Sequence, residues 1–226
     1  MGPLADISGP FFWNVHTHLS QAEPTAHAVY SCTYTDRSAE GCLRSLSIHP
    51  WQLTEENCEA QWQWLCKHLH GAGVVAIGEV GLDKCAEAPF DLQLRLFRRV
   101  VALSEECALP LILHVVRASN EILRLRMELH VCQPWIVHGF RGKRPLAEEY
   151  VRHGLYLSFG EHFQADALRA VPQERLLLET DESPLPIETV YDRVASELQM
   201  SLASLQSIVE QNVQKLFFED NSCIFK

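Results

Sequence analysis

The sequence lacks the C-x-x-C spacing of a structural zinc site or a redox dithiol. Its eight cysteines stand apart from one another, at Cys32, Cys42, Cys58, Cys66, Cys85, Cys107, Cys132 and Cys223. Cysteines without such pairing are typical of small apolar side chains in a reducing compartment. We therefore expect all of them to be reduced and most to be buried.

Long apolar runs are also missing. No segment approaches the roughly 18 uncharged apolar residues of a membrane span, and residues 1–10 lack the basic and apolar regions of a secretory signal. We expect a cytoplasmic protein with no membrane contact. The 226 residues contain no internal repeat, low-complexity tract or linker, so we expect a single domain over residues 1–226.

Basic residues are outnumbered, because 19 Lys and Arg against 29 Asp and Glu give a net charge of −10. This balance excludes a protein that coats nucleic acid with a broad basic surface. A substrate that carries phosphate must therefore be held by a local group of cations.

Short aliphatic and β-branched runs recur along the chain, each followed by a polar loop. The eight runs cover 11–16, 28–34, 43–49, 74–80, 110–116, 134–140, 155–160 and 175–180. Helical patterns fill most of the intervals, at 54–70, 89–107, 118–130, 143–153 and 162–170, and a last one covers much of 187–218. Alternating strands and helices predict an α/β fold with a parallel sheet, and eight such units predict a (β/α)8 barrel of the TIM type.

The first unit of this barrel is expected to be shortened or irregular. Only about a dozen residues separate the first two runs, and a parallel crossover needs a connection of at least that length. Residues 20–27 contain Pro24, which does not favour a helix there.

Ionisable residues stand at the carboxyl ends of the runs more often than buried strands tolerate. They are His16, His18, His49, Glu79, His114, His138 and Asp181. The carboxyl ends of barrel strands meet at one mouth, where active sites are assembled. We therefore expect these side chains to converge there.

The spacing of His16 and His18 places both imidazoles on one side of a strand, where they can bind one metal ion. An H-x-H pair alone is more typical of half-buried histidines with hydrogen-bond partners, and His114 or His138 alone is more typical of a core histidine. Glu79 ends an apolar run, where burial of a carboxylate is costly unless a cation compensates. The combination favours a metal site.

Two carboxylates lie on one face at the end of the last strand, because Glu179 and Asp181 are two residues apart. We expect Asp181 to face the mouth. Glu179 lies one pleat deeper, and it remains open as a ligand or as a hydrogen-bond acceptor.

Seven short stretches carry a resemblance to a known family. They are N-V-H-T-H-L at 14–19, I-H-P at 48–50, A-I-G-E-V-G-L-D at 76–83, L-I-L-H at 111–114, V-H-G-F at 137–140, L-S-F-G at 157–160 and L-L-E-T-D at 177–181. In this order, over nearly the whole chain, they resemble the TatD family of metal-dependent hydrolases, one of the amidohydrolase-like barrels.

The resemblance implies two divalent metal ions that share one carboxylate. It assigns the first metal to His16, His18, Glu79 and Asp181, and the second to Glu79, His114 and His138. Two such metals lower the pKa of a bound water and polarise the scissile group. Glu79 and Asp181 are the predicted catalytic pair, with Asp181 as acceptor of the proton from water.

The resemblance also implies a substrate, because family members are mostly described as nucleases that trim DNA or RNA ends. We expect phosphodiester hydrolysis, with a nucleic-acid end or a small phosphoester as the partner. Hydrolysis of a small amide, ester, lactone or phosphoester is the alternative, and a non-catalytic, metal-stabilised binding protein is the second. The ligand set suits zinc, manganese, iron or nickel, and magnesium less naturally; the oligomeric state stays open.

Four residues are expected to hold the substrate: His49, Arg117, Arg141 and Lys143. Arginine suits bidentate contact with phosphate, although Lys143 and its neighbour Arg144 are equally typical of a solvated helix start. Trp51 either stacks on a base or packs at the barrel rim.

Three positions differ from the usual family pattern. Asn14 replaces the usual Asp, Arg117 falls one place later than in H-x-R, and G-F-R-G-K follows where C-F-x-G is common. These changes affect the surroundings of the metal site and the substrate loops, and they remove no ligand.

Overall fold

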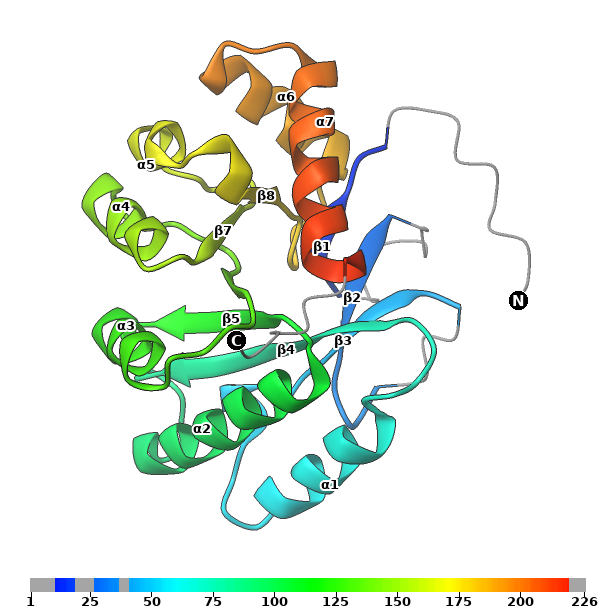
Figure 1. Ribbon diagram of the computed structural model, residues 1–226, viewed down its shortest axis with the longest axis vertical. Coiled ribbons are helices and arrows are strands. Elements are labelled where there is room, and N and C mark those ends of the chain that lie inside the picture. The colour runs from blue at the N-terminus through cyan, green and yellow to red at the C-terminus, as the bar shows by residue number, and fades with distance from the viewer. Residues whose placement is uncertain (1–10, 19–26, 37–40, 220–226) are drawn as a thin grey trace, which may run out of the picture.

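Eight parallel strands form one sheet in the order of the sequence, as seen in the computed structural model, which describes residues 11–18, 27–36 and 41–219 (Figure 1). The strands are β1 (Asn14–Thr17), β2 (Ala28–Cys32), β3 (Leu43–Leu46), β4 (Val74–Asp83), β5 (Leu111–Val116), β6 (Trp135–Val137), β7 (Tyr156–Phe159) and β8 (Leu176–Leu178). A parallel bridge joins Thr17 to Asp181, and Asp181 N donates to His16 O at 3.0 Å. This bridge brings the last strand back to the first, which confirms the predicted (β/α)8 barrel.

Among the described residues the helices begin after β3 and lie on the outside of the barrel in an arc, from α1 at one side to α7 beside β1 (Figure 1). They are α1 (Cys58–His68), α2 (Phe90–Cys107), α3 (Ser119–Glu128), α4 (Arg144–Arg152), α5 (Ala165–Ala170), α6 (Ile187–Leu198) and α7 (Leu202–Val213), with short helices η1 (Pro50–Gln52), η2 (Gln173–Arg175) and η3 (Gln214–Phe218). Their buried faces repeat at helical spacing. In α2, for example, Leu96, Phe97, Val100 and Val101 are buried.

The predicted helical stretch over 187–218 is divided in the structure. Gln199 ends α6 in a left-handed conformation with φ of 53°. Ser201 then begins α7, because its side chain accepts a hydrogen bond from Ser204 N at 3.1 Å and so caps a free amide. Ser201, a residue type favoured at helix N-caps, is the sequence signal for this break.

The first strand pair is irregular, as expected. The register between β1 and β2 shifts between Asn14 and Thr17. The segment in which no crossover helix was expected, 20–27, lies outside the described residues except for His27. The hydrogen bonds of β1 to β2 and to the chain after β8 nevertheless hold its carboxyl end at the barrel mouth.

A close approach of two central strands depends on glycine. A Cβ on Gly81 would lie 2.0 Å from His114 O, far inside any real contact. Glycine therefore lets β4 and β5 pair tightly at the level of the site, which is a physical reason for the second glycine of the G-E-V-G-L-D block.

Two further expectations concern composition. In the part of the chain that the structure describes, no helix is long and apolar enough to cross a membrane. Six described cysteines carry free thiols, but Cys132 is disulfide-bonded, so the prediction that all are reduced is wrong at this position. The prediction that most are buried is also wrong, because only Cys32 of these six free cysteines is buried.

Candidate functional site

Glu79 lies at the centre of the barrel mouth, and its two carboxylate oxygens face two sets of histidines. Oε2 lies 3.3 Å from His16 Nε2 and 3.8 Å from His18 Nε2. Oε1 lies 2.7 Å from both His114 Nδ1 and His138 Nε2. The side chains come from four strand ends, so one buried carboxylate connects two groups of nitrogen donors.

Asp181 completes the first group. Its Oδ1 lies 3.7 Å from His16 Nε2 and 3.5 Å from His18 Nε2, and one ligand atom from each of the three residues lies within 4.8 Å of the others. The hydrogen bond from Asp181 N to His16 O of β1 holds Asp181 in this position. The structure therefore brings together all six residues that the sequence predicts as metal ligands.

Opposite charges in the cluster stabilise one another. Burial raises the pKa of Glu79, but the positive charge of His138 and hydrogen bonds from His114 and His138 outweigh it and hold the pKa well below its usual range. Burial lowers the pKa of His138, but the charge of Glu79 and the hydrogen bond to Glu179 raise it well above its usual value. The cluster keeps its carboxylate ionised and favours a positive charge beside it.

Asp181 is also held in its charged form. Burial raises its pKa, while the hydrogen bond from His18 and the charges of His16 and His138 lower it by more. A carboxylate that stays ionised at the mouth can bind a cation or accept a proton.

The surroundings of His16 show that a metal ion fits at this place. Its side chain is fully buried, and its Nε2 has no hydrogen-bond partner among the described residues. A buried nitrogen of this kind, facing two carboxylates, is costly unless a cation lies between them. Imidazole and carboxylate are a suitable donor set for a divalent metal.

Two further carboxylates contact the ring nitrogens of His114 and His138 that face away from Glu79. Asp83 Oδ2 lies 3.0 Å from His114 Nε2, and Glu179 Oε1 lies 3.4 Å from His138 Nδ1. Carboxylates in this position fix the ring and leave the opposite nitrogen free for a metal. Glu179 also accepts a hydrogen bond from Gly139 N at 2.6 Å, so its position suits the hydrogen-bond acceptor role that the sequence left open.

The role of Asp83 was missed at the level of the sequence, although the signal was present. Alternate residues of a strand share one face, so Glu79, Gly81 and Asp83 all point into the same side of β4. Because Gly81 has no side chain, Asp83 is the next side chain after Glu79 on this face of the strand.

His49 lies against the same carboxylate. Its Nε2 is 3.0 Å from Glu79 Oε1, and its Nδ1 accepts a hydrogen bond from Trp51 N at 3.1 Å. Because Nδ1 is an acceptor, the proton of a neutral ring lies on Nε2, which makes that nitrogen a donor. The predicted donation from His49 to a substrate phosphate stays a prediction.

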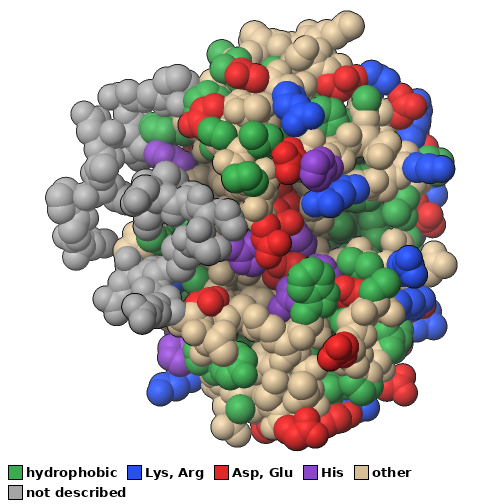
Figure 2. All heavy atoms as spheres, turned by 180° about the vertical axis from the view of Figure 1, so that it is seen from behind, with side chains coloured by type: hydrophobic (Ala, Val, Ile, Leu, Met, Phe, Trp, Pro, Cys, Tyr) green, Lys and Arg blue, Asp and Glu red, His purple; other side chains and the backbone are tan. Residues whose placement is uncertain are grey.

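Asp181 borders two cavities. The larger has a volume of about 570 Å³ and is lined by residues that include Trp51, Arg117, Phe140, Arg141, Leu146 and Tyr150. The smaller, of about 210 Å³, is lined by residues that include Gly139, Arg141, Glu161, His162, Glu179 and Ser183. Figure 2 shows histidine and acidic side chains gathered in a hollow of this face, with basic side chains nearby.

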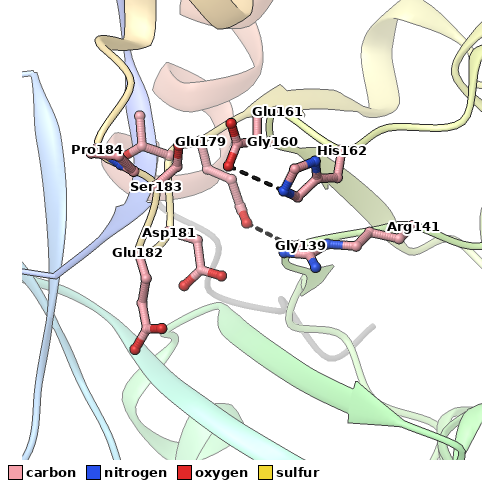
Figure 3. A pocket seen from close by; sticks show the side chains of 11 residues that line it. Gly139, Arg141, Gly160, Glu161, His162, Glu179, Asp181, Glu182, Ser183 and Pro184 are labelled. Atoms are coloured by element: carbon pink, nitrogen blue, oxygen red, sulfur yellow. Dashed lines mark hydrogen bonds and ion pairs between the residues drawn. The ribbon is translucent and has the colours of Figure 1, made fainter.

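The predicted substrate residues differ in their relation to these cavities. Arg117 lines the larger one, and Arg141 lines both; Figure 3 shows Arg141 reaching across from the wall opposite Asp181. Lys143 lines neither of them. Arg144 pairs with Glu148 at 2.7 Å, as expected of a solvated helix start.

Backbone strain is present at the same place. Arg117 and Asp181 adopt φ of 53° and 55°, in the left-handed region that side chains with a Cβ avoid. Both residues line the larger cavity. Such strain is typical of functional sites. Although Arg117 stands one position later than the arginine of the usual H-x-R pattern, its left-handed backbone turn lets it line the cavity.

Asn14 has a structural role. Its Nδ2 donates to Thr180 Oγ1 at 2.7 Å, and its Oδ1 accepts from Thr180 N at 3.0 Å. The amide thus ties β1 to the chain just before Asp181. This pair of bonds uses both ends of the Asn side chain, which an Asp in its place cannot reproduce when ionised.

The fold and the site define a class of protein: a (β/α)8 barrel whose mouth holds histidine and carboxylate clusters compatible with metal binding. A model of the family described as TatD related DNase matches residues 13–218. The chain belongs to this family, which confirms the resemblance seen in the motifs and the expected class of metal-dependent hydrolase.

Individual relatives support the assignment to this family. Over 187 residues the chain is 31% identical to the uncharacterized metal-dependent hydrolase YabD of Bacillus subtilis, covering 73% of this chain and 72% of YabD. It is 33% identical over 170 residues to the 3'-5' ssDNA/RNA exonuclease TatD of Cronobacter sakazakii, covering 67% of this chain and 60% of that protein. The chain thus spans less than two thirds of the exonuclease.

A solved structure supports the fold. The TatD homolog YjjV from Escherichia coli superposes with a TM-score of 0.72 at 23% identity, covering 84% of this chain and 85% of the other.

Proposed function

We propose that the protein is a two-metal nuclease that hydrolyses phosphodiester bonds at the ends of DNA or RNA strands. One observation supports this most strongly: the two oxygens of Glu79 face separate donor groups, His16 and His18 on one side and His114 and His138 on the other. A carboxylate in this position is suited to bridge two metal ions.

The proposed ligands follow from these contacts. His16, His18, Asp181 and Glu79 would hold one divalent ion, and Glu79, His114 and His138 the other. When bound, the pair supplies a lowered pKa for water and polarisation of the scissile phosphoryl group. Asp83 and Glu179 orient the histidines of the second site. Zinc, manganese, iron, nickel and magnesium are all candidates, in keeping with the ligands.

The remaining residues handle the proton and the substrate. Asp181 is ionised and borders both cavities, so it can accept the proton of the attacking water. Arg117 and Arg141 place cations in the larger cavity, where a phosphate diester would otherwise meet an acidic surface. His49 presents its Nε2 proton towards the same centre.

The choice of a nucleic-acid end rests on two points. A relative, TatD of Cronobacter sakazakii, carries the name of a single-strand exonuclease. The larger cavity, with a volume of about 570 Å³, combines an exposed aromatic ring with two arginines, a combination suited to a base and its phosphates.

Hydrolysis assays test the proposal directly. We expect the metal-loaded protein to shorten a single-stranded oligonucleotide from one end, and a chelator to abolish the reaction until metal is restored. Oligonucleotides labelled at the 5' or the 3' end would reveal the direction. Turnover of esters, lactones or amides together with intact oligonucleotides would contradict the nuclease and establish the small-molecule alternative.

The two arginines give a separate prediction. Arg117→Ala and Arg141→Ala should each weaken binding of a single-stranded oligonucleotide. Each should also reduce the slope of log affinity against log salt by roughly 0.7, because each removes one phosphate contact. Titrations at several salt concentrations, in an inactive Asp181→Asn background, measure both effects.

Arg95→Ala is the matched control, because it removes a cation of α2 that pairs with Glu55 on the surface. Its salt slope should equal that of the parent. If Arg117→Ala and Arg141→Ala also leave affinity and slope unchanged, neither residue contacts phosphate.

A further inference from the structure

Trp51 is unusually exposed for its size. The residue is 64% exposed, more than any other large hydrophobic residue in the part of the chain described here. It stands in η1, directly after His49 and Pro50, and lines the larger cavity. A large apolar ring that is exposed at the mouth of a polar site is open to contact with a ligand.

The ring is nevertheless held firmly. Trp51 Nε1 donates to Asp83 Oδ2 at 2.7 Å, and Trp51 N donates to His49 Nδ1 at 3.1 Å. The indole also makes T-shaped contacts with the rings of His49 and His114, at centroid distances of 4.9 and 5.6 Å. The side chain is thus fixed before any ligand arrives, which lowers the entropic cost of binding to it.

The hydrogen bond to Asp83 uses the edge of the indole. A hydrogen bond through Nε1 lies in the plane of the ring, and the two histidines meet it at interplanar angles of 75° and 79°. Because Trp51 is 64% exposed and lines the larger cavity, part of its ring surface is open to a ligand. A fixed aromatic face is the feature on which nucleobases stack without regard to their sequence.

The charges around the cavity suit the rest of a nucleotide. Arg117 and Arg141 line the same cavity as Trp51, so a base on the ring and its phosphates near the arginines can be bound together. Asp181 borders this cavity as well, which places the proposed reaction centre next to the bound nucleotide.

We infer that Trp51 is the stacking platform for an unpaired nucleobase of the strand being cleaved. This inference rests on the proposed function, and it adds the reason for a single-strand preference: a base can lie on Trp51 only after it leaves its own stack. Recognition is through the base face, so all four bases bind with similar affinity.

A binding cycle tests the platform separately from cleavage. Affinities are measured for a short single-stranded oligonucleotide and for the same strand with an abasic end nucleotide, in an Asp181→Asn background. With Trp51 present, loss of the base should weaken binding about 10-fold, within the range of base–aromatic stacking. With Trp51→Ala, the intact strand should bind as weakly as the abasic strand, and loss of the base should have no further effect.

Two variants serve as controls. Trp51→Phe keeps a ring without the hydrogen bond to Asp83 and should retain most of the difference between the two strands. Trp62→Ala removes an indole of α1 that lies against Arg99 and should behave as the parent. An equal effect of base removal with and without Trp51 would overturn the platform. Failure of the parent to cleave oligonucleotides that still bind through Trp51 would instead overturn the nuclease.

Discussion

Asp181→Asn is expected to lower kcat by about 10²- to 10⁴-fold, the usual contribution of a positioned general base. The amide keeps an oxygen that faces His16 and His18, but it cannot take up the proton of the attacking water. Substrate affinity should stay close to that of the parent, because the loss is confined to the transition state. Steady-state kinetics on a single-stranded oligonucleotide measure both quantities.

Glu188→Gln provides the matched control, since it makes the same carboxylate-to-amide change at an exposed position of α6. It should leave kcat unchanged. Metal content is measured for both variants, so that a lost ligand is distinguished from a lost base. Near-normal turnover of Asp181→Asn with full metal content would show that another group accepts the proton.

Glu79→Gln is expected to have the largest effect of any single change. The neutral amide offers one oxygen and one NH₂ group, so it cannot bind two cations through both of its ends. Bound metal should fall, and kcat should fall by at least about 10³-fold, because Lewis-acid stabilisation is worth several kcal/mol.

A second variant distinguishes loss of the metal site from a folding defect. Glu79→Asp keeps the charge but shortens the side chain by one methylene, so its oxygens reach the two histidine groups less well. It should also lose activity while its melting temperature and far-UV circular dichroism stay near those of the parent. Full activity in either folded variant would rule out a shared carboxylate.

The six proposed ligands were predictable because strand ends in a parallel barrel are equivalent positions. Residues far apart in sequence, such as His16 and Asp181, meet whenever β1 and β8 pair. The sequence pattern of apolar run followed by a polar residue therefore predicts both the fold and the convergence.

The supporting contacts were less accessible to sequence reasoning. The hydrogen bond of Asp83 to His114 depends on the tight pairing of β4 and β5 at Gly81, and the tautomer of His49 on a local turn at Trp51. These are details of backbone path and side-chain direction. A one-dimensional pattern identifies the strand on which a residue lies, but not the atom that its side chain meets.

The sequence pattern likewise could not show which of the predicted substrate residues line a cavity. Arg117 and Lys143 each stand just beyond a proposed ligand or its loop, yet only Arg117 lines a cavity. A left-handed turn at Arg117 redirects its side chain, whereas Lys143 is the residue before α4 and is exposed.

Metal counting on the purified, unmodified protein tests the central claim most directly. Elemental analysis of protein prepared without chelator and loaded with manganese or zinc should give two metal ions per chain, and Glu79→Gln should give fewer. Because both proposed sites use Glu79, the loss should affect the two sites together. A fully active parent that holds one ion per chain, or none, would contradict the two-metal centre.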